Sequence, residues 1–229
     1  MARQVRLEAE NGVYHVLNRG NYRADIFCSA RTKAAFLKCL GEACMRTGWV
    51  VHAWAIMSTH YHLALRTPRP NLVEGMRWLQ GTFANRFNRF RDERGHVFQG
   101  RYKGLRVDPA DGLGPLSHYI HLNPVRAMLC PAATLAGHSW TSLNWIVQPR
   151  ARAPWFDPTP ALAHAGGLAD TEPGWKRYCE YLDWLAENEP ARKAQKFDAM
   201  CRGWVIGTKD FVKRLADEQQ RALRQQHSV

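Results

Sequence analysis

Two histidines, His60 and His62, flank a single tyrosine in the apolar stretch WAIMSTHYHLALR, residues 54–66. Successive side chains of a β-strand alternate between its faces, so both imidazoles would share one face, about 7 Å apart. Because a metal–nitrogen bond is about 2 Å long, two such rings can converge on one cation. A His-x-His pair on its own is more often two partly buried histidines in a mixed sheet than a metal site, so other residues must decide.

Tyr119 and Asn123 provide further candidates in the segment SHYIHLNPVRA. Their spacing of four places them on the same face of a helix. The side-chain carbonyl of asparagine is an acceptable third ligand for a hard cation that two imidazoles already hold. Pro124 disfavours helical geometry at Asn123, so this residue should end the helix. The alternative is a core tyrosine followed by an Asn-Pro helix stop.

Phosphoryl transfer is the chemistry that such a set would perform. A tyrosine with its ordinary pKa of about 10 is a weak nucleophile and needs a metal or a positive field to activate it. A cation can polarise a phosphodiester while arginines hold the neighbouring phosphates, and the tyrosine can then attack to form a covalent intermediate. The bond energy stored in a phosphotyrosine would allow strands to be rejoined without ATP.

Alternating and helical patterns predict the elements that position these residues. A serine, Ser29, is the expected cap of the first helix. The predicted order β-α-β-β-α-β is that of a ferredoxin-like α+β fold, an antiparallel sheet with helices on one face. Tyr119 would lie on a third helix, over residues 111–122. The predicted strands cover residues 12–20, 49–57, 60–66 and about 104–107, and the predicted helices cover 29–46 and 71–91.

The C-terminal part differs in character from the first part. Four prolines in VQPRARAPWFDPTP indicate a boundary. We therefore divide the chain into a domain over residues 1–148, a Pro-rich linker over 149–170 and a helical C-terminal extension over 171–229. Thr208 is the expected cap of an amphipathic final helix.

The charge balance favours a polyanionic partner. The chain has 32 Lys and Arg against 20 Asp and Glu, a net charge of +12, and residues 1–130 alone carry +10. Such a field attracts nucleic acid first and an acidic membrane surface second. No apolar run approaches the roughly 18 residues of a membrane span, and the first residues do not resemble a signal peptide. Six cysteines without Cys-x-x-Cys spacing indicate reduced thiols, so we expect a cytoplasmic protein.

Four segments in order, YHVLNRGN, MSTHYHLALRTP, GHVFQGRYKG and SHYIHLNPVRA, carry a family resemblance. Together they resemble the single-tyrosine HUH transposases and, within these, the REP-associated tyrosine transposases. The resemblance spans about residues 3–145, and CRGWVIGTKDFV near the C-terminus resembles the family more weakly. It implies a ferredoxin-like core and a divalent cation, Mg²⁺ or Mn²⁺. It also implies cleavage of single-stranded DNA at hairpin-forming repeats, which leaves a 5′-phosphotyrosine and a free 3′-OH.

By motif, the resemblance makes His60 and His62 metal ligands, Asn123 the third ligand and Tyr119 the nucleophile. The sequence departs from the family at Tyr61, where an aliphatic residue is usual. Tyr61 should point away from the histidine face, which argues against its acting as the nucleophile. His15 is on the strand expected beside the third strand, so it could approach the site, although we interpret it as structural.

Cations interleaved with aromatic residues over 86–106 are typical of single-strand binding, where phosphates meet cations and bases stack on rings. The alternative is that the arginines form a solvent-exposed helix face and the phenylalanines belong to the core, as we expect for Phe87. Base-specific contacts cannot be assigned. The predicted DNA contacts, strongest first, are Arg101 and Lys103, then Arg19 and Arg23, then Arg86 and Arg89.

Three functions compete. The first is a metal-dependent transposase or strand-transferase acting on hairpin-bearing single strands, as a monomer or a homodimer. The second is a domesticated relative that binds or regulates at hairpins without cutting, for which the metal ligands would be irrelevant. The third is a metal phosphodiesterase that uses water as the nucleophile, which ranks last because the sequence offers no second metal cluster.

Overall fold

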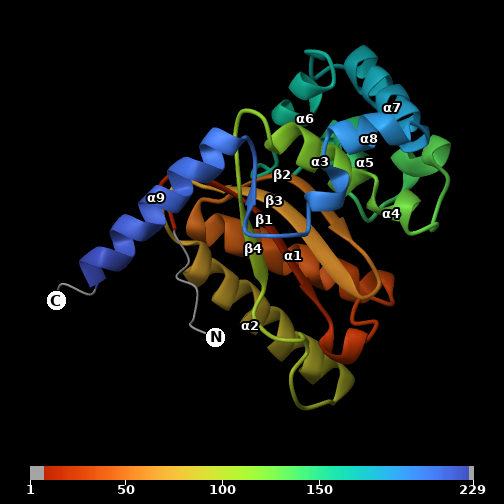
Figure 1. The fold of residues 1–229 in the computed structure, drawn as a ribbon. Helices are drawn as coiled ribbons and strands as arrows, with labels where there is room; N and C mark the ends of the chain where they lie inside the picture. Colours follow the sequence, from red (N-terminus) through yellow and green to blue (C-terminus); the bar gives the residue numbers. More distant parts are fainter. Residues whose placement is uncertain (1–7, 227–229) are drawn as a thin grey trace.

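A five-stranded sheet in the order β2-β3-β1-β4-β5 forms the centre of the computed structural model, which describes residues 8–226 (Figure 1). Neighbouring strands are antiparallel, except that β5 runs parallel to β4. The first four strands match the predicted ones closely, and the α+β class is confirmed. The strands are β1 (Gly12–Arg19), β2 (Val50–Ile56), β3 (His60–Thr67), β4 (Lys103–Val107) and β5 (Val205–Ile206).

Two long helices, α1 (Ala30–Thr47) and α2 (Leu72–Arg91), cover one face of this sheet. Ser29 caps α1 as predicted, through a reciprocal capping box with Thr32. Gly48 ends the helix at φ +73°, a left-handed conformation that glycine adopts without strain. The apolar stripes of both helices pack on the side chains that β1 and β3 direct to this face, which gives the main core.

The second face of the sheet is also covered, which goes beyond the predicted arrangement. Helix α3 (Leu113–His121) packs across β2 and β3, so the helix that carries Tyr119 lies on the side opposite α1 and α2. Strand β5 adds to the edge of the sheet at β4. A two-residue strand is too short to show alternation, which is why its sequence predicts only a turn.

Residues of the expected linker pack closely against the first part of the chain. The amide of Val51 donates to the carbonyl of Trp155, and the amide of Asp157 donates to that of Val51. Helix α6 (Thr159–His164) lies against α3. The division into domains remains a prediction, and residues 1–7 and 227–229 of its outer parts lie outside the described residues.

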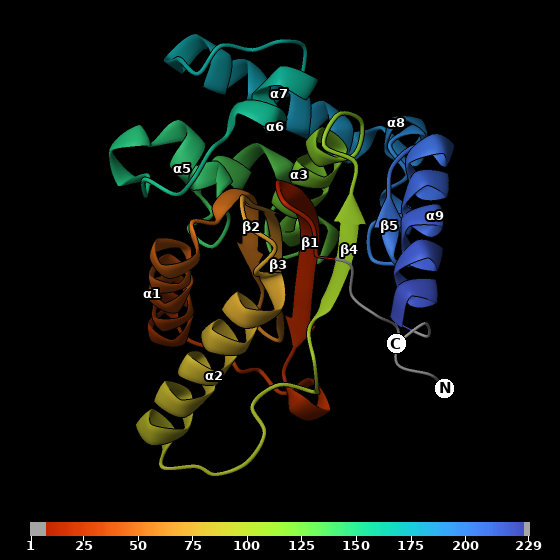
Figure 2. The same ribbon diagram turned by 90° about the vertical axis from the view of Figure 1, so that its left-hand side faces the viewer.

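The C-terminal part of the chain lies above α3 and beside β5 at the edge of the sheet (Figure 2). As predicted, Thr208 caps the final helix α9 (Lys209–Gln226), with its hydroxyl 3.2 Å from the amide of Phe211. None of the helices within residues 8–226 combines the length and apolar character that crossing a bilayer requires. The remaining helices are α4 (Asn123–Arg126), α5 (Leu143–Val147), α7 (Glu172–Glu187) and α8 (Glu189–Ala194), with four short 3-10 turns at Asn21–Arg23, Ala132–Gly137, Pro149–Ala151 and Phe197–Ala199.

A buried polar network ties α3 to α7 and to β2. The hydroxyl of Tyr178 lies 2.9 Å from the Nδ1 atoms of both His118 and His121. Since one hydroxyl has one proton, it donates to one of these rings and accepts from the other. The Nε2 atom of His121 lies 2.8 Å from the hydroxyl of Ser142, which accepts from the amide of Trp54. All three ring systems are buried, so the network keeps both histidines neutral.

Gly75 of α2 offers a direct test of this packing. A Cβ atom there would lie 2.1 Å from Cζ2 of the buried Trp49, whose indole is held by a hydrogen bond to Asn71. We expect Gly75→Ala to lower the free energy of unfolding by about 1–3 kcal/mol through overpacking. Gly81 on the same helix has open space around it, so Gly81→Ala should raise stability by about 0.5–1 kcal/mol. Urea unfolding of the two variants measures both effects, and a tolerated Gly75→Ala would contradict the packing.

Candidate functional site

Strand β3 directs His60 and His62 to the face that α3 covers. Their ring centroids are 5.1 Å apart, edge to face. Tyr61 points to the opposite face, where it is fully buried against Phe36 and its hydroxyl accepts a hydrogen bond from Gln80. Burial raises the pKa of the Tyr61 phenol far above its ordinary value. Tyr61 is therefore a core residue in this fold, as its alternation predicts.

Helix α3 brings Tyr119 to the same side as the two histidines. The centroid of its ring lies 5.9 Å from that of His62, edge to face. Its hydroxyl lies 3.0 Å from Sγ of Cys201, and the guanidinium of Arg126 sits 4.6 Å above its ring. Burial and then the Cys201 thiol raise the pKa of Tyr119 to about 12, while Arg126 acts to lower it. The phenol is thus protonated at neutral pH in this arrangement.

Asn123 lies where α3 gives way to α4, as expected from Pro124. It is buried, and its side-chain amide donates a 3.0 Å hydrogen bond to the carbonyl of Tyr119. The amide nitrogen is engaged in this bond, so the side-chain oxygen is the atom of Asn123 that could bind a metal ion. Within the described part of the chain, no hydrogen bond joins Asn123 to either His60 or His62.

His15 of β1 reaches the site directly, which sequence reasoning treated only as an option. Its Nδ1 lies 2.7 Å from the carbonyl of Met200, and its Nε2 lies 2.9 Å from Nδ1 of His62. A carbonyl only accepts, so Nδ1 of His15 carries a proton and Nε2 accepts one from His62. His62 then has its Nε2 lone pair free. The sequence pointed to this contact only through the expectation that β1 and β3 are neighbouring strands.

Cys201 is the residue of the site that the sequence did not indicate. The ligand atoms of His15, His62 and Cys201 all lie within 4.8 Å of one another, a group that could hold a metal ion. Cys201 and Met200 come from the segment before β5, more than 80 residues beyond Tyr119 in the chain. No local pattern predicts so distant a contact.

The environment keeps the histidines of the site neutral. Burial, and secondarily the positive charge of Arg19, lowers the pKa of His60 to about 4. Burial lowers the pKa of His62 well below its ordinary value, and His15 acts in the same direction. Neutral imidazoles with free lone pairs are the form that binds metal ions. The donor chemistry of His60 and His62 therefore suits a divalent cation.

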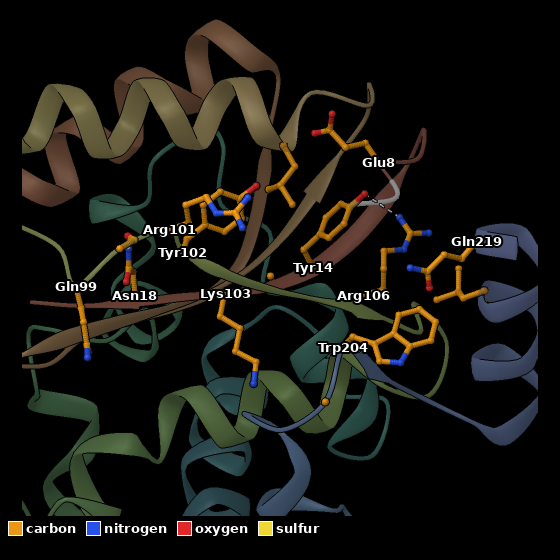
Figure 3. Close-up of a pocket in the computed structure, with 15 residues that line it drawn as sticks. Glu8, Tyr14, Asn18, Gln99, Arg101, Tyr102, Lys103, Arg106, Trp204 and Gln219 are labelled. Carbon is orange, nitrogen blue, oxygen red and sulfur yellow. Dashed lines mark hydrogen bonds between the residues drawn. The ribbon is translucent and has the colours of Figure 1, made fainter. Parts of the chain in front are cut away.

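Arg101 and Lys103, the strongest predicted DNA contacts, line a groove of about 660 Å³ along β4 (Figure 3). Arg106 extends this basic edge and donates to the hydroxyl of Tyr14. Lys103 points to the histidine face, where its Nζ donates to the carbonyl of Cys201 at 2.6 Å. A second groove, of about 1130 Å³, lies between α2 and residues 95–102, and shares Arg101 and Tyr102 with the first.

The other predicted DNA contacts separate into two groups. Arg19 lies at the end of β1 directly opposite His60, and Arg23 is exposed in the turn that follows. Arg86 and Arg89 belong to α2, on the opposite side of the sheet from the histidines. Arg86 forms a 2.9 Å ion pair with Glu42 of α1. The structure therefore brings Arg19 to the site, leaves Arg23 exposed in the following turn, and places Arg86 and Arg89 on the other side of the sheet.

The chain belongs to the IS200-like transposase family, a family of HUH-type nucleases, because the family model "Transposase IS200 like" matches residues 8–123. Among solved structures, it is similar to a REP-associated tyrosine transposase bound to a REP hairpin. That likeness has a TM-score of 0.55 and 13% identity, and covers 69% of this chain and 94% of the other.

The crystal structure of a Deinococcus radiodurans R1 protein has a lower TM-score, 0.37, with 18% sequence identity. That match covers 56% of this chain and 91% of the other. Curated proteins gave no match. The resemblance noted in the sequence is thus confirmed at the level of the family and of the fold.

Proposed function

We propose that this protein is a divalent-metal-dependent transposase that cleaves and rejoins single-stranded DNA at hairpin repeats through a 5′-phosphotyrosine on Tyr119. The observation that carries the proposal is the approach of the Tyr119 ring to His62 on the face where His60 and His62 lie together. Membership of the IS200-like family supports it, as does the hairpin DNA bound to the similar transposase.

His60, His62 and the side-chain oxygen of Asn123 would hold Mg²⁺ or Mn²⁺ in this proposal. Two neutral imidazoles and one amide oxygen form an acceptable set for such ions. A bound ion would supply Lewis-acid polarisation of the scissile phosphodiester. The thiol of Cys201 is a softer ligand, so we do not assign it to a Mg²⁺ or Mn²⁺ site.

Tyr119 performs the covalent step. Its oxygen bonds to the phosphorus, the bond from phosphorus to the 3′ oxygen breaks, and the leaving strand takes a proton to end in a free 3′-OH. The phenolic proton passes to solvent, and Arg126 over the ring favours the phenolate electrostatically. Rejoining reverses the step, because a 3′-OH attacks the phosphotyrosine. The Tyr119 hydroxyl must first exchange its contact with Cys201 for the phosphate.

A non-cleaving hairpin-binding protein is the second candidate. The contact between the Tyr119 hydroxyl and Cys201 favours it, as does the raised pKa of Tyr119. A labelled single-stranded hairpin, incubated with the protein and Mn²⁺ or Mg²⁺ and run on a denaturing gel, separates the two. Strand transfer predicts a covalent adduct that EDTA abolishes. Binding in a native gel without any adduct would favour the second candidate, and turnover without linkage would favour water as the nucleophile.

The His15–His62 hydrogen bond predicts a difference between two substitutions. In His15→Asn the amide can still donate to Met200, but it cannot reach His62. In His15→Gln the amide oxygen can still accept from Nδ1 of His62. Because outer partners of a ligating histidine contribute to metal affinity, we expect His15→Asn to weaken Mn²⁺ binding about 10–100-fold and His15→Gln to weaken it less.

Electron paramagnetic resonance of free Mn²⁺ measures this difference without DNA. Equal affinity in both variants, or weaker binding in His15→Gln, would contradict the role of His15 as a positioning residue for His62.

A further inference from the structure

Tyr22 stands out among the described aromatic residues because it is 93% exposed. Its backbone has φ +51° and ψ +26°, in the left-handed region, and Arg23 follows at φ +60°. Residues with a Cβ adopt this conformation at a free-energy cost, and an exposed phenol ring gains nothing from burial. Strain of this kind, held in place by surrounding structure, is typical of binding and active sites.

The turn that carries Tyr22 is fixed at both ends. The amide of Gly20 donates to the carbonyl of Thr59, and the amide of Asn21 donates to the carbonyl of Val97. Within the turn, the amide of Arg23 donates to the carbonyl of Gly20. These bonds join the turn to the β2–β3 connection and to the loop before β4. The exposed position of Tyr22 is therefore built into the fold.

The turn lies beside the proposed active site. It follows Arg19, which pairs with His60 across β1 and β3, and Thr59 immediately precedes His60. The charge around it is positive on balance. Arg19 and Arg23 belong to the turn and its approach, and Arg94 lines a hollow of about 430 Å³ that Tyr22 also lines. The same hollow contains Asp25 and an ion pair between Arg91 and Glu93. An anionic strand entering the site from this end would meet cations and one open aromatic ring.

We propose that Tyr22 is a stacking platform for an unpaired nucleobase of single-stranded DNA, with Arg19 and Arg23 holding the adjoining phosphates. The inference rests on the proposed function for the identity of the strand. Stacking needs only the face of a base, so the site takes purines and pyrimidines alike. The surrounding positive charge favours a polyanion over an apolar protein segment as the occupant.

Two strained residues of the same chain allow a matched test. Met128 is 92% exposed at φ +56°, like Tyr22, but it has no ring on which a base can stack. Asparagine tolerates this backbone conformation better than either residue. Tyr22→Asn and Met128→Asn should therefore both raise the midpoint of thermal unfolding. Only Tyr22→Asn should weaken DNA binding.

Binding is measured by fluorescence anisotropy with a single-stranded hairpin oligonucleotide in EDTA, so that no cleavage occurs. We expect Tyr22→Asn to lower affinity about 5–100-fold, and Tyr22→Phe and Met128→Asn to leave it unchanged. A 2-aminopurine placed along the unpaired flank should be quenched at one position by the wild type and not by Tyr22→Asn. Unchanged affinity and quenching in Tyr22→Asn would overturn the proposal and leave a protein contact as the alternative for the exposed ring.

The binding and quenching measurements do not require DNA cleavage, so they test the stacking platform separately from strand transfer. A wild type that binds but forms no adduct, together with weakened binding in Tyr22→Asn, would refute strand transfer alone. An adduct in the wild type, together with unchanged binding in Tyr22→Asn, would refute the stacking platform alone.

Discussion

Replacing Tyr119 with phenylalanine should abolish the covalent protein–DNA adduct and leave hairpin binding unchanged. The substitution removes the attacking oxygen and keeps the ring that packs against His62 and Phe197. Its effect on folding should be small, since the hydroxyl contacts the thiol of Cys201 and lies near Arg126, and one such hydrogen bond contributes about 1 kcal/mol to stability. Denaturing and native gels with one labelled hairpin measure the two outcomes separately.

Tyr61→Phe is the matched control for this prediction. Tyr61 lies between the two histidines in sequence, but its hydroxyl faces Gln80 in the core. Tyr61→Phe should keep the adduct and lose about 1 kcal/mol of stability, because the Gln80 amide loses its partner. An adduct that survives in Tyr119→Phe, or disappears in Tyr61→Phe, would mean that the nucleophile is wrongly assigned.

Mild acid should destabilise the protein strongly. Burial lowers the pKa of His121 to about 3 and that of His118 well below its ordinary value. In the unfolded chain both would titrate near pH 6.5. Between these values the unfolded state binds more protons than the folded state, so stability falls as the pH drops below about 6.5.

His121 alone should remove about 1 kcal/mol by pH 5.5, out of the 5–15 kcal/mol typical of a folded protein, and His118 acts in the same direction. His15, whose pKa burial lowers to about 4, acts in the same direction. Urea unfolding at pH 7.5, 6.5 and 5.5, in EDTA to exclude metal binding, tests this. A free energy of unfolding that stays constant over this range would contradict neutral, buried histidines in the network around Tyr178.

The elements of the first half of the chain could be predicted because their signals are local. Ser29 and Gly48 mark the ends of α1, and alternation around Tyr61 assigns the faces of β3 correctly. The likeness of four ordered motifs to one family also anticipated the fold. The approach of Tyr119 to the histidine face follows from helical spacing combined with that fold.

Contacts between distant segments could not be predicted in the same way. Cys201 and Met200 lie in a segment without periodicity, and only the folded chain brings them to Tyr119 and His15. Charge along the sequence also could not show which cations lie near the histidines. Arg86 belongs to a basic run, yet its guanidinium pairs with Glu42 across two helices, away from the histidines. A count of cations cannot distinguish an ion pair between helices from a phosphate contact.

The most direct test of strand transfer through Tyr119 is the identity of the residue that becomes attached to DNA. The wild-type protein is incubated with a single-stranded hairpin and Mn²⁺, digested with nuclease and protease, and sequenced by tandem mass spectrometry. We predict a nucleotide joined through its 5′ phosphate to Tyr119, within the peptide that contains SHYIHLNP. A nucleotide on any other residue, or cleaved DNA with no modified peptide, would contradict it.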